Sequence, residues 1–449
     1  VASRSEGGGE VVVVHRRVAG WVEQREFHSR TVTIRPPNAL PLDVLYFHQY
    51  FATRRRSTGT RSYELARRLV ERGHRVTIVS RDTRRLESGR DEEPQGRLLG
   101  HETIDGIDVL YLNIPYANRY PKPVRLASFT AFTAAATVAG ALERKPDIVF
   151  ASSTPLTIGI AGLVTARLKR VPFVFEIRDL WPAVPVSMGA LTSGPAVRSA
   201  EWLERHLYDG SERIVVCSVG ALEELRSRGI AAEKLVLIPN AADLDVFGPD
   251  VVDQGFRGRH GLEGRFVALY AGSMATANGL DQLVDAADAL RRWGDEGVTI
   301  VAVGDGGERP RLEERARELG LTNLLFLPPV PKEELAGVVG AADVTLTIFA
   351  PYPILETTSP NKFFDSLAAG KPVVVNLDGW LRRLVEENDA GVWIPAGNAE
   401  ALAGALLALA GNPEGVARMG RNARALAERE FGRDEMADRL ARTLEEVAK

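Results

Sequence analysis

Cysteine is almost absent from this chain of 449 residues, in which Cys217 is the only one. A single cysteine excludes an intramolecular disulfide and a thiolate metal cluster. Cys217 lies in the strand-like run 214–218, where a small buried filler is favoured over a nucleophile. The seven histidines are scattered without the spacing of paired metal ligands, so we expect no metal site.

A strong excess of one charge is also lacking, since the formal net charge is −3. Such a balance gives no field for nucleic acid, and we expect no nucleic-acid partner. No apolar core follows the N-terminal charges, so a signal peptide is not predicted. The uncharged run 126–142 is shorter than the ~20 residues of a membrane span, and polar residues interrupt the run 148–166. We predict neither run to cross a membrane.

Residues 1–41 show no clear periodicity apart from a short valine run, and they carry three consecutive glycines and many arginines. We interpret them as a disordered or foreign leader, with the ordered chain starting near Leu42. Deletion of residues 1–40 should then leave folding and activity intact.

From Leu42 onward, buried strand patterns alternate with helical patterns, which predicts parallel sheets in an α/β protein. The first series covers 42–247, and a polar, glycine-rich stretch at 248–264 is typical of an interdomain link. A second series covers 265–430, and we expect a helix in 431–449 to pack back on the first domain. Two doubly wound Rossmann-like domains would face each other across a cleft at the carboxyl ends of their strands.

The most informative stretch, 359–376, has the pattern of a polar loop, a short helix at 362–369, a stop at Gly370 and a buried strand. The N-terminus of the helix, with Lys362 beside it, can hold a phosphate. Asp365, one turn on, can accept hydrogen bonds from sugar hydroxyls. Pyrophosphate joined to ribose is the simplest ligand with both needs. The alternative is an ordinary loop, helix and strand with a solvated Asp365.

A nicotinamide or P-loop enzyme is disfavoured by the glycine pattern. The first strand is followed by His48, Gln49 and Tyr50 in place of a glycine-rich turn. The glycines at 304–307 lack a third member at the spacing of a dinucleotide fingerprint.

Eight short motifs occur in an order and spacing that resemble the retaining glycosyltransferases of family 4, which have the GT-B fold. The motifs lie at 45–51, 59–64, 151–157, 175–182, 238–240, 270–273, 304–306 and 359–372. The resemblance extends from about Leu42 to the C-terminal region. Within the family, the motifs are most similar to the branch that builds bacterial O-antigen and capsule, which includes N-acetylfucosamine-type and other N-acetylhexosamine transferases.

The resemblance implies roles for residues of the second domain. Gly272, Ser273 and Gly279 would form the loop for the donor pyrophosphate. Asn361 and Lys362 would contact the phosphates or the far side of the sugar, and Asp365 would hold the ribose. For the glycines, tight strand-to-helix turns are the alternative.

Two departures from the wider family bear on these roles. Thr357 stands where that family has the first glutamate of its donor signature, with Glu356 one residue away. Asn278 replaces the lysine of its donor loop. The phosphate charge must then be met elsewhere, by Lys362 first and by Arg309 second.

For catalysis, the resemblance implies front-face attack assisted by the donor's own phosphate, with Lys362 stabilising the leaving pyrophosphate. Asp179 would lie by the acceptor hydroxyl; a helix N-cap before Leu180 is its alternative. Arg178 occupies a place where many relatives have histidine. The sequence Asp243-Leu244-Asp245 spells the motif of metal-dependent transferases, but its position at the domain link disfavours a metal role.

A basic loop would flank the acceptor in the first domain, and the alternative is a solvated surface loop. The residues predicted to bind the acceptor are Arg54, Gly59, Thr60, Arg61 and Arg178.

The expected substrates are a UDP-sugar and a polyprenyl-diphosphate-linked saccharide, with no metal cofactor. We expect a cytoplasmic enzyme that contacts the inner face of the membrane peripherally. Two alternatives are a nucleotide-sugar 2-epimerase with the same fold and a non-catalytic sugar-binding protein. Product analysis with the donor alone separates the epimerase, and absence of nucleotide binding would support the binding protein.

Overall fold

The computed structural model describes residues 40–56, 59–81, 98–116 and 120–449. The leader proposed for residues 1–41 therefore lies outside the described residues, except for its last two. The described chain contains two sheets, and the prediction of two doubly wound α/β domains with the GT-B fold is confirmed.

The first sheet has eight strands in the order β3-β4-β2-β1-β5-β6-β7-β8. All neighbours are parallel except β3, which runs antiparallel to β4. The strands are β1 Asp43–Phe47, β2 Arg75–Arg81, β3 Leu99–Ile104, β4 Ile107–Leu112, β5 Ile148–Ser152, β6 Phe173–Ile177, β7 Arg213–Val216 and β8 Leu235–Leu237. Because β1 lies between β2 and β5, the winding reverses there, and ligands bind at the carboxyl side of such a point.

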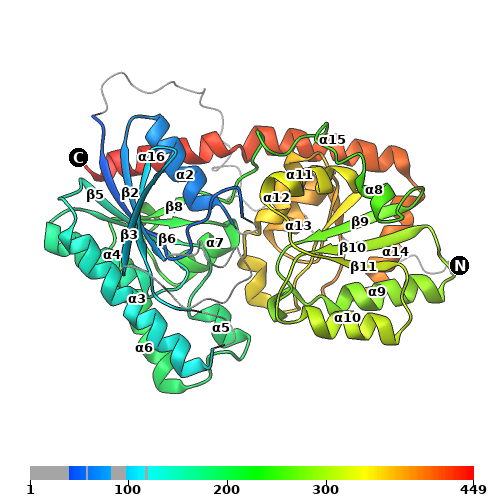
Figure 1. Ribbon diagram of the computed structural model, residues 1–449, viewed down its shortest axis with the longest axis horizontal. Coiled ribbons are helices and arrows are strands. Elements are labelled where there is room, and N and C mark those ends of the chain that lie inside the picture. The colour runs from blue at the N-terminus through cyan, green and yellow to red at the C-terminus, as the bar shows by residue number, and fades with distance from the viewer. Residues whose placement is uncertain (1–39, 57–58, 82–97, 117–119) are drawn as a thin grey trace, which may run out of the picture. The chain divides into compact units, whose positions relative to one another are not determined.

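Helices cover both faces of this sheet (Figure 1). They are α2 Arg61–Glu71, α3 Lys122–Leu142, α4 Ile158–Lys169, α5 Ala183–Ser187, α6 Gly194–Asp209 and α7 Val219–Ser227. Since side chains alternate along a strand, Leu45 and Phe47 of β1 join the core under α3 and α4. Val44 and Tyr46 point the other way, into the core under α2.

The second sheet has six parallel strands in the order β11-β10-β9-β12-β13-β14. They are β9 Phe266–Ala271, β10 Val298–Val303, β11 Leu324–Leu327, β12 Val344–Thr347, β13 Val373–Val375 and β14 Gly391–Trp393. The accompanying helices are α8 Phe256–Arg259, α9 Asp281–Arg292, α10 Arg309–Glu318, α11 Lys332–Ala341, α12 Asn361–Ala368, α13 Trp380–Glu387, α14 Ala399–Ala410 and α15 Pro413–Glu430. The winding of this sheet reverses between β9 and β12.

The last helix, α16 Arg433–Val447, lies along α2 of the first sheet (Figure 1). Its Met436 and Leu440 are buried in the core shared with β1 and α2. Arg72, the residue directly after α2, donates hydrogen bonds to Asp438 of α16, with the Nε bond at 2.7 Å. The end of the described chain thus completes the cover of the first sheet.

Several elements were absent from the sequence-based expectation, and β3 and α6 are two of them. Strand β3 is an edge strand of six residues, Leu99–Ile104, whose side chains are alternately exposed and half-buried and whose sequence shows no alternation of polar and apolar residues. Helix α6 keeps only Glu204, Leu207 and Tyr208 buried, so its apolar stripe is narrow. Edge and surface elements bury little, and therefore leave a weak hydrophobic pattern.

Candidate active site

A cavity of about 630 Å³ opens at the point where the winding of the second sheet reverses. Its walls come from the ends of β9 and β10, from α11 and α12, and from one residue of the first domain, Gly59. The residues at its polar side are Gly272, Ser273, Asn278, Asp305, Lys332, Asn361, Lys362, Asp365 and Ser366. The cavity volume is typical of a small-molecule site.

Helix α12 carries four of these residues, Asn361, Lys362, Asp365 and Ser366, and its apolar side is firmly anchored. Phe363 and Phe364 are fully buried, and Phe364 packs edge-on against Phe431 at 5.1 Å between ring centroids. Gly370, with φ of +66°, ends the helix in the left-handed conformation that favours glycine. The predicted short helix and its glycine stop are confirmed. The anchored face fixes the direction of Lys362 and Asp365.

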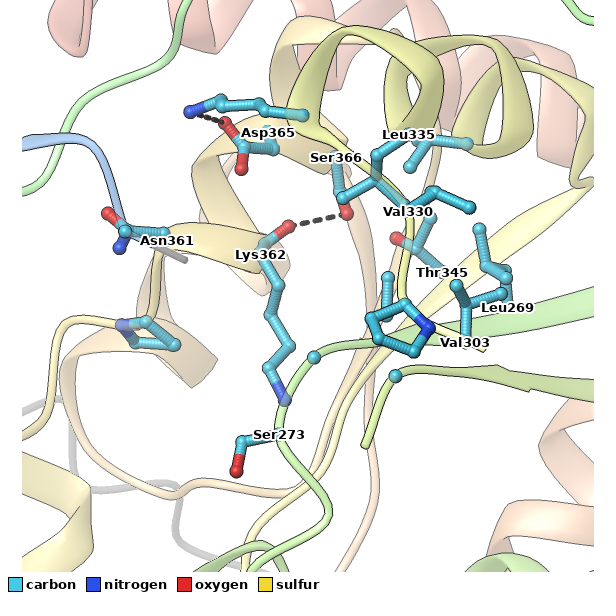
Figure 2. Close-up of a pocket in the computed structure, with 18 of the residues that line it drawn as sticks. Leu269, Ser273, Val303, Val330, Leu335, Thr345, Asn361, Lys362, Asp365 and Ser366 are labelled. Atoms are coloured by element: carbon cyan, nitrogen blue, oxygen red, sulfur yellow. Dashed lines mark hydrogen bonds and ion pairs between the residues drawn. The ribbon is translucent and has the colours of Figure 1, made fainter. Parts of the chain in front are cut away.

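Lys362 extends from α12 toward Ser273, as Figure 2 shows. Its Nζ lies 3.8 Å from the centroid of the Tyr270 ring and 5.2 Å from that of Phe349. Within the described part of the chain this buried ammonium has no hydrogen-bond partner. Burial lowers the pKa of Lys362 to about 7. The site therefore holds a cation that, among the described residues, contacts aromatic rings and has no hydrogen-bond partner.

Two of the three predicted donor-loop residues, Gly272 and Ser273, line the cavity with this lysine. A Cβ built on Gly272 would lie 3.3 Å from both Cε and Nζ of Lys362, so the missing side chain leaves room for the ammonium. Asn278 also lines the cavity.

Asp365 belongs to a buried cluster of four charges with Lys332, Asp243 and Arg433. Lys332 Nζ lies 3.3 Å from Asp365 Oδ1 and also donates to Asp243, while Arg433 Nε donates to Asp243 at 2.5 Å. The alternative of a solvated Asp365 is wrong, because its exposed fraction is 8%.

The cluster shifts the protonation of its two carboxylates in opposite directions. Burial raises the pKa of Asp365 to about 6 against the attraction of Lys332. Although burial opposes it, Arg433 and Lys332 hold the pKa of Asp243 well below its usual range. Asp243 is thus engaged by two cations, and its neighbour Asp245 pairs with Arg54 at 2.6 Å.

Two predicted donor residues lie apart from the cavity lining. Gly279, with φ of +57°, passes close to another backbone, since a Cβ there would lie 2.7 Å from Ala350 Cα. This supports the alternative of a tight turn. The guanidinium of Arg309 donates hydrogen bonds to Gly304 O, at 2.9 Å, and to the carboxylate of Glu313. Neither residue is therefore placed at the donor cavity.

Gly59 of the first domain lies between residues from both domains. A Cβ built on it would lie 3.0 Å from Asn361 Nδ2 and 3.5 Å from Arg178 Nη2. Thr60 Oγ1 lies 3.5 Å from Lys332 Nζ. The structure thus brings three predicted acceptor residues, Gly59, Thr60 and Arg178, to the edge of the predicted donor site.

The prediction that Arg61 belongs to an exposed basic loop is wrong. Its exposed fraction is 1%, and it donates to Glu176 at 3.0 and 2.8 Å and to the Pro239 carbonyl at 2.6 Å. Arg54, in the same predicted loop, pairs with the buried Glu64 at 2.5 Å and with Asp245. These guanidiniums hold the first domain together.

Asp179 lies just beyond the carboxyl end of β6 and is half-buried. Burial raises its pKa, and the nearby Arg178 opposes that shift. The N-cap alternative is wrong, because α5 begins at Ala183 with Pro182 as its cap. Asp179 lies outside the donor cavity lining, and its acceptor role stays a prediction.

Two residues that touch the predicted site were missed from sequence. Lys332 starts α11 with no motif around it, and only the fold shows that it meets Asp365. His48 Nε2 lies 3.3 Å from Arg178 Nη1, and burial lowers the pKa of this imidazole. His48 belongs to the motif at 45–51, but the sequence alone assigns it no role at the site.

Comparison with known proteins agrees with this geometry. A glycosyl transferase 4-like domain matches residues 58–241, and a glycosyl transferases group 1 domain matches residues 253–426. The chain is a glycosyltransferase of family 4 type with the GT-B fold. These domain matches favour transfer over the epimerase and the binding-protein alternatives.

Individual relatives of this glycosyltransferase are distant. It is 24% identical to the putative colanic acid biosynthesis glycosyl transferase WcaI of Escherichia coli over 53% of this chain and 58% of that protein. It is 29% identical to a D-inositol 3-phosphate glycosyltransferase of Pseudarthrobacter chlorophenolicus over 59% of this chain and 63% of that protein. The match thus spans less than two thirds of both relatives.

The fold is similar to that of Anabaena Alr3699/HepE, crystallised with UDP-glucose. The TM-score is 0.67 at 18% identity, over 90% of this chain and all of that one.

Proposed function

We propose that this glycosyltransferase binds a UDP-sugar in the cavity at α12 and transfers the sugar with retention of configuration, without a metal. The observation that carries the proposal is the buried ammonium of Lys362, which the described residues leave without a partner. A buried charge is costly unless it is paired, so the cavity favours an anion. A donor diphosphate supplies that anion.

The same arrangement accounts for catalysis. When the glycosidic bond breaks, negative charge grows on the leaving diphosphate, and fixed donors that meet this charge lower the barrier. Lys362 and the N–H groups at the start of α12 provide such donors, in place of the lysine that Asn278 replaces. The donor's own phosphate would accept the acceptor proton on the same face.

Asp365 is the proposed partner of the ribose hydroxyls. Its ion pair with Lys332 orients the carboxylate toward the cavity edge and favours the ionised form, which accepts hydrogen bonds. UDP is preferred because HepE, with a similar fold, was crystallised with UDP-glucose.

The acceptor would approach from the first domain, past Gly59 and Arg178 toward Asp179. A lipid-linked saccharide of bacterial surface-polysaccharide synthesis is the proposed acceptor, as the name of WcaI suggests. An N-acetylhexosamine is the proposed transferred sugar, from the motif resemblance alone.

Helix α3 supports peripheral contact with a membrane. Among the described helices it alone is long and apolar enough to cross one, yet 33% of its apolar window is buried and it packs on α4. Leu126 and Leu142 on it are exposed by 65% and 82%. We propose that this exposed side lies against the lipid surface on the cytoplasmic side.

The test is calorimetric titration of UDP, GDP and ADP into the full chain, with and without EDTA. We expect selective UDP binding that survives EDTA. Lys362→Met and Asp365→Ala should each weaken it at least about tenfold, since charge-assisted hydrogen bonds are lost. Lys371→Met is the matched control, because this lysine is half-buried, its pKa is also lowered by burial, and it lies outside the cavity.

No nucleotide binding by the wild type would overturn the donor assignment. Binding that EDTA abolishes would overturn the metal-free mechanism. Equal losses in Lys362→Met and Lys371→Met would show that Lys362 has no specific role.

A further inference from the structure

A second buried cation, which has no hydrogen-bond partner among the described residues, lies at the carboxyl end of β2. Arg81 is 3% exposed, and its Nε, Nη1 and Nη2 have no hydrogen-bond partner within the described residues. A guanidinium carries five N–H donors. Burial lowers the pKa of Arg81, and the nearby phenols of Tyr50 and Tyr116 oppose that shift. The described residues around it contribute no carboxylate.

Aromatic rings surround this guanidinium. Its Cζ lies 4.8 Å from the centroid of the Tyr116 ring and 5.2 Å from that of Phe132 on α3. Cation–π contact stabilises a charge through the ring face, but it leaves the in-plane N–H groups unmet. The rings therefore hold the guanidinium plane in place and do not satisfy its donors.

A second arginine approaches the same ring. Arg125 of α3 has its Cζ 6.0 Å from the Tyr116 centroid, and its buried Nε also has no hydrogen-bond partner within the described residues. Two like charges on one ring repel each other unless a negative charge lies between or beside them. Their joint presence thus points to a ligand rather than to packing.

We propose that Arg81 and Arg125 form a binding site for a phosphate-type oxyanion, distinct from the donor cavity. The site lies at the carboxyl ends of β1, β2 and β4, where a parallel sheet binds ligands. Arg81 N donates to Gln49 O at 3.2 Å, which ties the site to the end of β1. A planar guanidinium matches two oxygens of a phosphate at once.

The sheet position assigns this anion to the acceptor side of the enzyme. That assignment rests on the proposed function, whereas the anion site itself does not. The phosphate could be free in solution or presented on a lipid, and the experiment separates these two sources.

The experiment measures anion binding to the full chain with the donor cavity saturated by UDP. Inorganic pyrophosphate is titrated by calorimetry into the wild type, Arg81→Met and Arg81→Lys. We expect the wild type to bind pyrophosphate and Arg81→Met to bind it about tenfold or more weakly. Arg81→Lys keeps the charge but not the bidentate geometry of the guanidinium, so its affinity should be intermediate. UDP binding should be unchanged in both variants, which shows that they are folded.

A lipid arm uses flotation with phosphatidylcholine vesicles, with and without phosphatidic acid. Arg81-dependent binding to the phosphatidic acid vesicles alone assigns the site to a lipid phosphate. Binding of pyrophosphate assigns it to a soluble one. Absence of Arg81-dependent binding in both arms overturns the proposal.

The melting temperature without anion gives an independent readout. If the guanidinium of Arg81 lacks its counter-ion when no ligand is bound, Arg81→Met should raise the melting temperature, because methionine needs no polar partner in the buried site. If Arg81 is only a structural cation–π residue, Arg81→Met should lower it, which would overturn the proposal. Arg382→Met is the matched control: Arg382 lies 3.9 Å from the Trp393 centroid but is paired with Glu386.

Failure of this site and failure of the proposed function are distinguishable. If UDP does not bind at all, the donor assignment fails. Pyrophosphate titration into Lys362→Met then still reports on Arg81 alone.

Discussion

Arg61 of the first domain and Lys362 of the second are both buried cations near the ligand-binding ends of their sheets, but their surroundings differ. The donors of Arg61 meet Glu176 and two backbone carbonyls. Within the described part of the chain, Lys362 has no hydrogen-bond partner and lies against the faces of Tyr270 and Phe349. Burial alone therefore does not mark a binding site in this protein. A buried cation without a hydrogen-bond partner among the described residues, such as Lys362, marks a binding site. A buried cation with all its partners, such as Arg61, belongs to the framework.

The largest expected effect is on the framework. Arg61→Met leaves Glu176 buried without its counter-ion, which costs about 3–5 kcal/mol in the free energy of unfolding. The measurement is the denaturant midpoint, followed by fluorescence. The double variant Arg61→Met/Glu176→Met should recover part of this loss, because neither charge remains. A midpoint for Arg61→Met equal to that of the wild type would contradict the framework role.

Lys332 lies between the two cases, because it is paired but also borders the cavity. Lys332→Met should cost about 2–3 kcal/mol of stability, less than the Arg61 change because Asp243 keeps Arg433. Without Lys332, the pKa of Asp365 should rise above about 6. As the pH is lowered, Asp365 is then protonated earlier, and UDP binding begins to weaken at a higher pH than in the wild type. UDP titrations between pH 5 and pH 8 measure this shift. Lys332→Arg keeps the positive charge and should therefore restore most of the stability and most of the wild-type pH dependence.

The pH dependence of UDP binding tests the unmet charge of Lys362. Below its pKa of about 7 the ammonium is already charged, and a bound diphosphate raises that pKa. Affinity should therefore fall as pH rises above 7, by up to about tenfold per pH unit, with uptake of a proton. Calorimetry in buffers of different ionisation enthalpy measures the uptake. A flat profile from pH 7 to 9, like that expected for Lys362→Met, would contradict the prediction.

The smallest effect is expected at the surface. Arg75 pairs with Asp43 in an exposed position, with 66% of its side chain accessible. Screening by water and the cost of ordering long side chains make such a pair nearly neutral. Arg75→Ala should leave the midpoint and UDP binding unchanged within error. A clear loss of stability or of UDP binding in Arg75→Ala would contradict the idea that burial explains the difference between Arg75 and Arg61.

Much of the fold could be predicted because buried parallel strands and their helices leave strong patterns. The helix that carries Lys362 and Asp365 was readable from its phenylalanines and from Gly370. Among the elements that were missed, β3 and α6 are surface elements with weak patterns.

The partners of charged side chains were much harder to predict. The contacts of Arg61 with Glu176, of Lys332 with Asp243, and of Arg81 with Tyr116 join residues that are far apart in the sequence. Only tertiary structure decides whether an arginine beside a loop points outward or into the core. This is why the motif at Arg61 predicted a basic surface where the protein has a buried ion pair.

Helix α16 has a consequence for biosynthesis. Met436 and Leu440 fill the core beside β1, nearly four hundred residues earlier in the chain. During translation, one face of the first sheet should therefore remain incompletely covered until the helix at 433–447 has left the ribosome. The second sheet has its own strands and helices from 266 to 430 and can close sooner. The domain made first should be the domain finished last.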